Sequence, residues 1–138
     1  RPMFKAHTIM KRHVLSVKKD ADIYEAIRKM VKHNITGLPV INDDKTLAGI
    51  VTEKDVLRLL YNIEDRAGKV EDFMTTPVVS FDHEDSLIDI TESFINNHFR
   101  RVPITENGKL AGIISRKDII GYILKLRHRD AAVPAVHL

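Results

Sequence analysis

The chain has 138 residues, of which 43% are hydrophobic and 30% charged, an ordinary balance for a globular protein. The absence of cysteine excludes disulfides, thiolate metal sites and cysteine nucleophiles, and no apolar run is long enough to cross a membrane or to form a signal peptide. The net charge of +3 is too small and too scattered for a strong polyanion binder.

The first half of the chain predicts short strands that alternate with amphipathic helices. A strand is expected over residues 14–17, and Asp22 is a candidate helix N-cap with Glu25 at the capping-box spacing. The helix that follows carries one apolar stripe: Ile23, Ala26, Ile27, Met30 and Val31. Strands are expected at 38–41 and 47–51, separated by a turn at 42–45. A second helix begins at Thr52, and its apolar residues are Val56, Leu57, Leu60 and Tyr61.

The second half predicts the same order of elements, β-α-β-β-α. A strand is expected over residues 78–81, and Ser86 caps a helix with the stripe Leu87, Ile90, Thr91, Phe94 and Ile95. Strands at 102–104 and 110–114 flank a turn at 106–108, and Ser115 begins the last helix. Residues 62–72 are expected to be a polar linker and residues 128–138 a loose tail. Because each helix has one apolar face, both helices of a half should lie on one side of a three-stranded sheet.

The two halves are also copies of one another in sequence. Met10, Val14, Ser16 and Pro39 recur as Met74, Val78, Ser80 and Pro103, and the string Leu47-Ala48-Gly49-Ile50-Val51-Thr52-Glu53-Lys54-Asp55-Val56 recurs as Leu110-Ala111-Gly112-Ile113-Ile114-Ser115-Arg116-Lys117-Asp118-Ile119. A repeat of about 60 residues predicts two like units related by a pseudo-two-fold axis, with paired clefts where they meet. Each half alone is small for a stable core, so we expect the halves to bury surface against each other.

A hydroxyl residue followed three positions later by aspartate begins the last helix of each half, as Thr52 and Asp55 and as Ser115 and Asp118. This spacing before an apolar run is typical of a helix capping box. A helix start also favours anions, and a carboxylate one turn in can accept hydrogen bonds from both hydroxyls of a ribose. The spacing alone leaves both interpretations open, and for Thr52 and Ser115 the two roles are compatible.

These motifs resemble the tandem CBS domain, named after cystathionine β-synthase, over nearly all of residues 8–126. The string from Gly49 to Asp55 carries the resemblance together with the preceding Leu38-Pro39-Val40, and both recur in the second half, the latter as Val102-Pro103-Ile104. The resemblance implies an α+β fold with repeats at 8–61 and 73–127, sheets packed face to face and helices outside. It also implies a regulatory module that binds AMP, ADP or ATP between the repeats, or less commonly S-adenosylmethionine or NAD, and signals to an attached or partner protein. Most such pairs form homodimers.

The resemblance further implies two unequal nucleotide sites. Asp55 and Asp118 would hold the ribose, and Arg100 and Arg101 would contact the phosphates of the ligand on Asp55, since arginine presents a fixed fork to phosphate oxygens. Lys54 and Lys117 occupy motif positions that can also reach phosphate; the alternative for all four cations is a solvated surface charge. Adenine would lie among apolar residues from both halves, for which plain core packing is the alternative. For the Asp55 site these are Ile50, Met74, Pro77, Val79 and Phe99, and for the Asp118 site Met10, His13, Leu15, Ile35, Thr36 and Ile113.

No catalytic constellation stands out in the sequence. The seven histidines form neither a zinc-binding spacing nor a cluster with carboxylates, so we expect a protein that is not an enzyme, without a metal site and located in the cytoplasm. Two alternatives to nucleotide sensing remain: a ligand-free dimerisation scaffold, and a nucleic-acid binder prompted by Arg100, Arg101 and the basic residues 125–129. Because the chain begins at Arg1, we expect it to be a fragment of a larger protein.

Overall fold

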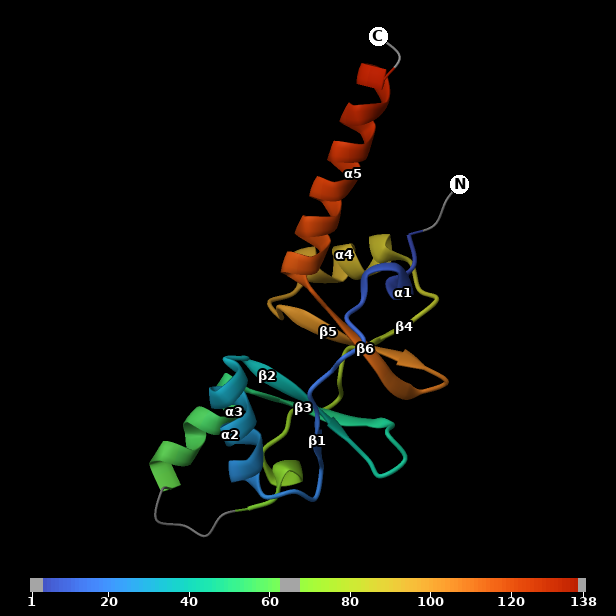
Figure 1. The fold of residues 1–138 in the computed structure, drawn as a ribbon. Helices are drawn as coiled ribbons and strands as arrows, with labels where there is room; N and C mark the ends of the chain where they lie inside the picture. The colour runs from blue at the N-terminus through green and yellow to red at the C-terminus, as the bar shows by residue number, and fades with distance from the viewer. Residues whose placement is uncertain (1–3, 63–67, 137–138) are drawn as a thin grey trace. The chain divides into compact units, whose positions relative to one another are not determined.

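The computed structural model describes residues 4–62 and 68–136, which form two compact units (Figure 1). Unit 1 consists of Arg1–Arg12, Ser80–Thr105 and Ala111–Leu138, and unit 2 consists of His13–Val79 and Glu106–Leu110. Each unit therefore takes most of its residues from one sequence repeat and a short segment from the other. In particular, the residues just before the first strand of each repeat belong to the opposite unit.

Unit 2 is built on a three-stranded sheet in the order β1 (Val17–Lys18), β2 (Gly37–Ile41) and β3 (Leu47–Thr52). Strand β1 runs parallel to β2, and β2 runs antiparallel to β3 with Leu38 opposite Val51. Both of these side chains are fully buried, and the same cluster takes in residues of α2 (Ile23–His33) and α3 (Glu53–Leu57). The two helices thus share one face of the sheet, as the sequence predicts.

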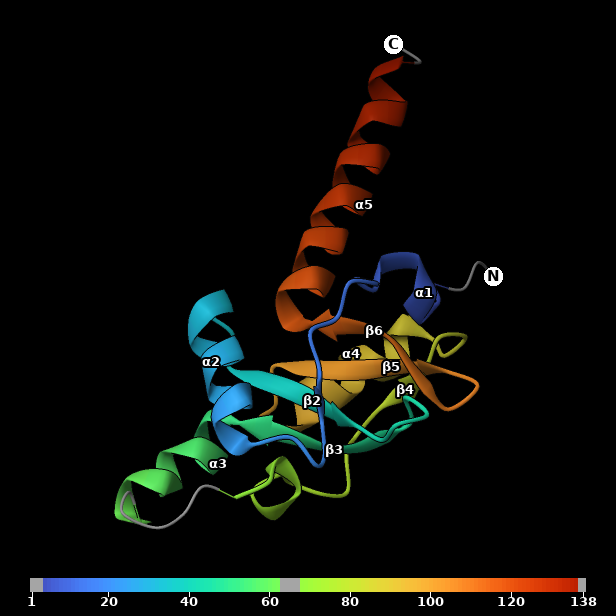
Figure 2. The same cartoon turned by 60° about the horizontal axis from the view of Figure 1, so that its bottom comes forward.

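Unit 1 repeats this arrangement with the sheet order β4 (Phe81–Asp82), β5 (Arg101–Glu106) and β6 (Lys109–Ser115). Its helices are α1 (Ala6–Ile9), α4 (Leu87–Asn96) and α5 (Arg116–Val136), and the first turns of α5 lie beside α4 (Figure 2). The core contains Met10 and buried residues from the strands and from all three helices: Ala6, Leu87, Ile90, Phe94, Val102, Ile104, Ile114 and Ile119. The two units together confirm the predicted α+β class.

The predicted helix starts are confirmed, and the two long amphipathic helices end differently. Asp22 accepts a hydrogen bond from the Tyr24 N–H, and Ser86 plays the same part for Ile88. Helix α2 ends on Asn34 in the left-handed conformation (φ 51°), a common helix terminator. Helix α4 has no such residue; instead the Arg116 guanidinium donates to the carbonyls of Phe94, Asn97 and Phe99 at 2.7–3.1 Å.

The structure corrects the predicted first strand of each repeat. Residues 14–17 and 78–81 were expected to form these strands, but β1 covers only Val17–Lys18 and β4 only Phe81–Asp82. Only these dipeptides pair with β2 and β5, because each first strand runs along the very end of its parallel neighbour. The residues just before each dipeptide have a strand-like sequence, but no neighbouring strand in the described part of the chain pairs with them.

Three further expectations differ from the structure. Helix α3 ends at Leu57 and continues as a 3₁₀ turn (Arg58–Asn62). Of the four predicted apolar residues, Leu57, Leu60 and Tyr61 are exposed and Val56 packs against the core, together with Leu59 of the turn. The segment expected as a polar linker, 62–72, contains a second 3₁₀ turn whose Val70 is fully buried in unit 2, while residues 63–67 lie outside the described part. The segment expected as a loose tail, 128–138, continues helix α5 as far as Val136.

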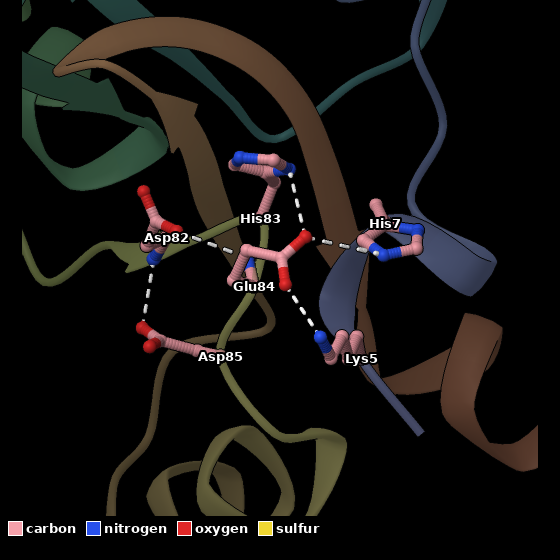
Figure 3. Close-up of polar contacts among 6 residues, drawn as sticks. All are labelled: Lys5, His7, Asp82, His83, Glu84 and Asp85. Atoms are coloured by element: carbon pink, nitrogen blue, oxygen red, sulfur yellow. Dashed lines mark hydrogen bonds and ion pairs between the residues drawn. The ribbon is translucent and has the colours of Figure 1, made fainter. Parts of the chain in front are cut away.

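A polar cluster attaches the N-terminal segment to the loop that precedes α4, within unit 1 (Figure 3). The Glu84 carboxylate accepts from Lys5 and lies 3.5 Å from His7 Nε2 and 3.7 Å from His83 Nδ1. The hydrogen bond from Lys5 is the main reason that the pKa of Glu84 is lowered, and the charges of Lys5, His7 and His83 act in the same direction. Backbone hydrogen bonds from Ala6 and His7 to the loop before α4 complete the attachment.

Candidate functional site

Asp55 lies on the first turn of α3, directly after β3 ends at Thr52. Its side chain accepts hydrogen bonds from the Thr52 N–H at 2.9 Å and from the Thr52 hydroxyl at 3.0 Å, both on Oδ2. Only 5% of the residue is exposed, although carboxylates are rarely buried without a charged partner. The aspartate is therefore held in a capping box, but it does not project into bulk solvent as a merely capping carboxylate usually does.

Thr75 is a second neighbour of this carboxylate, from a segment far along the chain. Its hydroxyl donates to Asp55, with 3.0 Å to Oδ1 and 3.2 Å to Oδ2. Backbone pairing places it there, because the Thr75 N–H donates to the Ile50 carbonyl at 2.7 Å and the Ile50 N–H to the Thr75 carbonyl at 3.0 Å. We call Thr52, Asp55 and Thr75 the Asp55 site.

The corresponding group in unit 1 has a lysine where unit 2 has Thr75. The Ser115 N–H donates to Asp118 Oδ2 at 2.8 Å, and the Asp118 N–H donates to the Ser115 hydroxyl at 3.1 Å. Lys11 Nζ lies 3.3 Å from Asp118 Oδ1, and the Lys11 backbone pairs with Ile113 through two hydrogen bonds of 3.0 Å. We call Lys11, Ser115 and Asp118 the Asp118 site.

A methionine packed on a glycine sets the position of each incoming segment. A Cβ added to Gly49 would lie 2.6 Å from Met74 Sδ, and one added to Gly112 would lie 2.6 Å from Met10 Sδ. Only a glycine at position 49 or 112 leaves room for the methionine side chain. Each methionine directly precedes the residue that reaches the aspartate, which is Thr75 after Met74 and Lys11 after Met10. The repeated glycine and methionine of the sequence therefore act together to bring the next side chain to the aspartate.

The chemistry of both sites suits a ligand that carries two neighbouring hydroxyl groups. A carboxylate offers about four lone-pair directions on two oxygens. Asp118 uses one for the Ser115 N–H and one for the ammonium of Lys11, a neighbour whose side chain is 71% exposed. At Asp55 the partners that a diol would replace are the rotatable hydroxyls of Thr52 and Thr75.

The basic residues predicted to contact phosphate differ in their surroundings. Arg101, at the start of β5, has a buried Nε with no hydrogen-bond partner among the described residues. An unpaired buried donor is costly, and an anion would relieve that cost. Arg100, Lys54 and Lys117 are exposed.

The predicted adenine-contacting residues fall partly into the cores and partly on the surface. Met10 is buried in the unit 1 core and Phe99 packs edge-on against Phe94 with ring centroids 5.8 Å apart. The half-buried members are Leu15, Ile35, Thr36, Ile50, Met74 and Ile113, and the exposed members are His13, Pro77 and Val79. Core packing is thus established for Met10, Phe99, Leu15, Ile35 and Met74.

The structure brings together only part of each predicted site within one unit. Unit 2 holds the Asp55 set except Phe99, Arg100 and Arg101, which are in unit 1. Unit 1 holds the Asp118 set, including Met10, except four of its five members from the first repeat: His13, Leu15, Ile35 and Thr36. Each predicted nucleotide site draws on both units, and its complete membership stays a prediction.

Lys11 and Thr75 were not predicted from the sequence as neighbours of the two aspartates. The available signal was their equal position in the repeat, directly after the repeated methionines Met10 and Met74. Lys11 pairs with β6 and Thr75 pairs with β3, each through a single isolated bridge. Local sequence patterns do not predict such a bridge, because neither residue lies in a strand of its own.

Other kinds of site are not found in the part of the chain that the structure describes. Within residues 4–62 and 68–136, no three His, Asp or Glu side chains are grouped in a way that could hold a metal ion. Among the same residues, none of the helices combines the length and apolar character needed to span a bilayer.

Comparison with known proteins agrees with this architecture. The family model of the CBS domain matches residues 6–62 and again residues 70–125. An uncharacterized protein, MJ1225 of Methanocaldococcus jannaschii, is 36% identical over 112 residues, which are 81% of this chain and 40% of that protein. The inosine-5'-monophosphate dehydrogenase of the same organism is 35% identical over 117 residues, 84% of this chain but only 23% of the enzyme. The chain thus spans less than half the length of these two relatives.

Among solved structures, the CBS-pair protein CBSX2 from Arabidopsis thaliana superimposes with a TM-score of 0.84 and 27% identity, covering 92% of this chain and 99% of CBSX2. The same protein in complex with AMP gives a TM-score of 0.81 at 27% identity, covering 90% of this chain and 98% of the other. The two matches of the family model and the two repeated sheets lead to one conclusion: this chain belongs to the CBS domain family and is a tandem pair of CBS domains.

Proposed function

We propose that this CBS pair is a regulatory module that binds adenosine nucleotides through Asp55 and Asp118 and transmits the bound state to an attached or partner protein. The observation that carries the proposal is the position of the two carboxylates. Each is oriented by a backbone N–H at a helix start, at 2.9 Å for Asp55 and 2.8 Å for Asp118, and each is largely shielded from solvent. A ribose would present its two hydroxyls in place of the side-chain partners, which are the Thr52 and Thr75 hydroxyls at Asp55 and Lys11 at Asp118.

Two further observations support a phosphorylated ligand. The orphaned Nε of Arg101 lacks an acceptor within the described residues, and guanidinium groups are well suited to phosphate oxygens. The relative CBSX2, at 27% identity, has been solved in complex with AMP. AMP, ADP and ATP are therefore the first candidates, with S-adenosylmethionine and NAD as less favoured ones.

The regulated protein is expected to be fused to this module or to bind it. In the inosine-5'-monophosphate dehydrogenase of Methanocaldococcus jannaschii, the matched region is 23% of the whole enzyme. A CBS pair can therefore occur beside a separate catalytic region. We propose that this chain plays the regulatory part in such an arrangement and carries no catalytic activity itself.

Thermal unfolding with a panel of adenosyl compounds tests the proposal. A ligand at 100 times its Kd should stabilise the folded protein by about 2.7 kcal/mol through mass action. Asp55→Asn and Asp118→Asn should each reduce the ligand-induced shift, measured from the variant's own melting temperature. The matched control is Asp89→Asn, which removes an exposed carboxylate from the first turn of α4. The proposal fails if calorimetric titration to millimolar nucleotide gives no binding heat with the wild-type chain.

A second proposed property is homodimerisation through the outer faces of the helices. Unit 2 exposes four large apolar side chains and unit 1 exposes four at the matching repeat positions, all between 58% and 87% exposed: Val31, Leu57, Leu60 and Tyr61, then Ile95, Ile120, Ile123 and Leu124. In unit 1, Ile95, Ile120 and Ile123 line a groove of about 480 Å³ between α4 and α5. Exposed apolar patches of this kind mark interaction sites, and a second copy presents the same faces in return.

Light scattering after size exclusion tests the dimer. The wild-type chain should have twice the monomer mass, and Leu57→Glu combined with Ile120→Glu should yield monomers without loss of secondary structure. A control pair, Lys32→Glu and Lys125→Glu, changes charge at exposed positions on α2 and α5. A monomeric wild type, or a double glutamate variant that remains dimeric, would contradict the proposal.

A further inference from the structure

The two aspartate sites share their backbone arrangement, but the side chain that reaches the aspartate from the neighbouring segment differs in charge. Lys11 and Thr75 occupy the same place in their units, since each follows a methionine packed on a strand glycine and each pairs its backbone with the isoleucine after that glycine. Each side chain also reaches the aspartate, at 3.3 Å for Lys11 and 3.0 Å for Thr75. The difference between the sites is thus a cation in place of a neutral hydroxyl.

The lysine has a consequence for any diol that binds Asp118. Two hydroxyl donors on the carboxylate would compete with the ammonium for Oδ1. Giving up this contact costs little, because the lysine side chain is 71% exposed and ion pairs with exposed partners contribute weakly. The released ammonium then remains next to the bound sugar on a flexible four-carbon stem, where an anionic group of the ligand can take the place of the carboxylate.

At Asp55, a bound diol would leave no cation without a partner, because Thr75 is neutral. When a diol replaces its hydrogen bond, the hydroxyl can rotate to another acceptor or to water, and no charge is left without a counterion. Lys54 and Lys117 cannot produce this difference, because a lysine stands at the same motif position in both repeats.

We propose that Lys11 makes the Asp118 site selective for a phosphorylated nucleoside over the same nucleoside without phosphate, while Thr75 leaves the Asp55 site without this source of selectivity. The proposal rests on the proposed function and adds to it a residue that determines specificity. It assigns the Lys11 cation to the Asp118 site alone, where an anion must lie beside the diol; any preference for phosphate at the Asp55 site has to come from other residues, such as the predicted Arg100 and Arg101.

Calorimetric titration with adenosine and with AMP tests this assignment. The quantity measured is the ratio of the adenosine Kd to the AMP Kd at the site that is lost in Asp118→Asn. Lys11→Thr should lower this ratio about 3- to 5-fold, the upper part of the range for an ion pair formed by an exposed lysine. The reciprocal Thr75→Lys should raise the ratio at the Asp55 site.

Two variants separate the role of Lys11 from net charge and from folding. Arg12→Thr removes the same charge from the neighbouring exposed residue and should leave the ratio within twofold of the wild type. Lys11→Arg keeps a cation at the position and should retain most of the selectivity. If AMP binds but Lys11→Thr leaves the ratio unchanged, or Arg12→Thr lowers it equally, the inference is wrong while the proposed function stands. If neither compound binds the wild-type chain, both are overturned.

Discussion

Gly49→Ala tests whether close packing on a strand glycine positions the Asp55 site. The new Cβ would lie 2.6 Å from Met74 Sδ, 2.9 Å from Met74 Cγ and 3.0 Å from the Thr75 carbonyl oxygen. Carbon and sulfur in contact normally stay beyond about 3.5 Å, so the methionine segment must move away from β3. Overpacking of this kind costs about 1–3 kcal/mol, and loss of glycine's extra chain entropy returns about 0.5–1 kcal/mol. The difference spans about 0–2.5 kcal/mol, so we expect a net destabilisation of roughly 1 kcal/mol.

A double-mutant cycle in urea isolates the cause. Met74→Ala alone should destabilise the protein by less than the roughly 2–5 kcal/mol of a fully buried methionine, because Met74 is only half-buried. In Gly49→Ala/Met74→Ala the alanine Cβ has no side chain to displace, so the two changes should be coupled by about 1 kcal/mol in the favourable direction. Purely additive effects would refute the packing argument.

Gly121→Ala is the control for this cycle. A Cβ at Gly121 would meet nothing within 4 Å, and the residue lies inside α5. Replacing an exposed helical glycine by alanine should stabilise the protein by about 0.8–1 kcal/mol. Opposite signs at Gly49 and Gly121 would show that the cost at Gly49 comes from its neighbours rather than from the change of residue type.

The remaining predictions concern the helix ends and the cluster at Glu84. Arg116→Met should destabilise the protein by about 1–3 kcal/mol, because three carbonyls at the end of α4 and in the following turn lose their hydrogen-bond donor. An unchanged urea midpoint would contradict this. Asp22→Ala should cost about 1 kcal/mol by removing the acceptor of the Tyr24 N–H, and Asp22→Asn should recover most of it. The pKa of Glu84 is lowered chiefly by the hydrogen bond from Lys5, so this residue contributes stability above its unfolded pKa and loses that contribution as the pH falls through its folded pKa. Glu84→Gln should therefore be less stable than the wild type at neutral pH, and the difference should vanish in acid; a constant difference across the pH range would rule out this linkage.

Much of the local structure could be predicted from the sequence. The apolar stripes and the capping residues Asp22 and Ser86 placed α2 and α4 correctly, because caps and periodicity act within a few residues. The repeat itself indicated two like units and drew attention to Asp55 and Asp118. The strands were less well predicted, since β1 and β4 each pair over only two residues and a strand needs a partner that the local sequence does not specify.

The neighbours of the two aspartates depended on tertiary structure. Lys11 reaches Asp118 by pairing with Ile113, about a hundred residues away, and Thr75 reaches Asp55 by pairing with Ile50. Through these pairings the residues ahead of each repeat's first strand join the opposite unit. The sequence by itself determined the duplication, the helix starts and the acidic residues, because short-range interactions control them. The exchange of segments between units, and with it the cation at one aspartate and the hydroxyl at the other, was decided only by backbone pairing between distant parts of the chain.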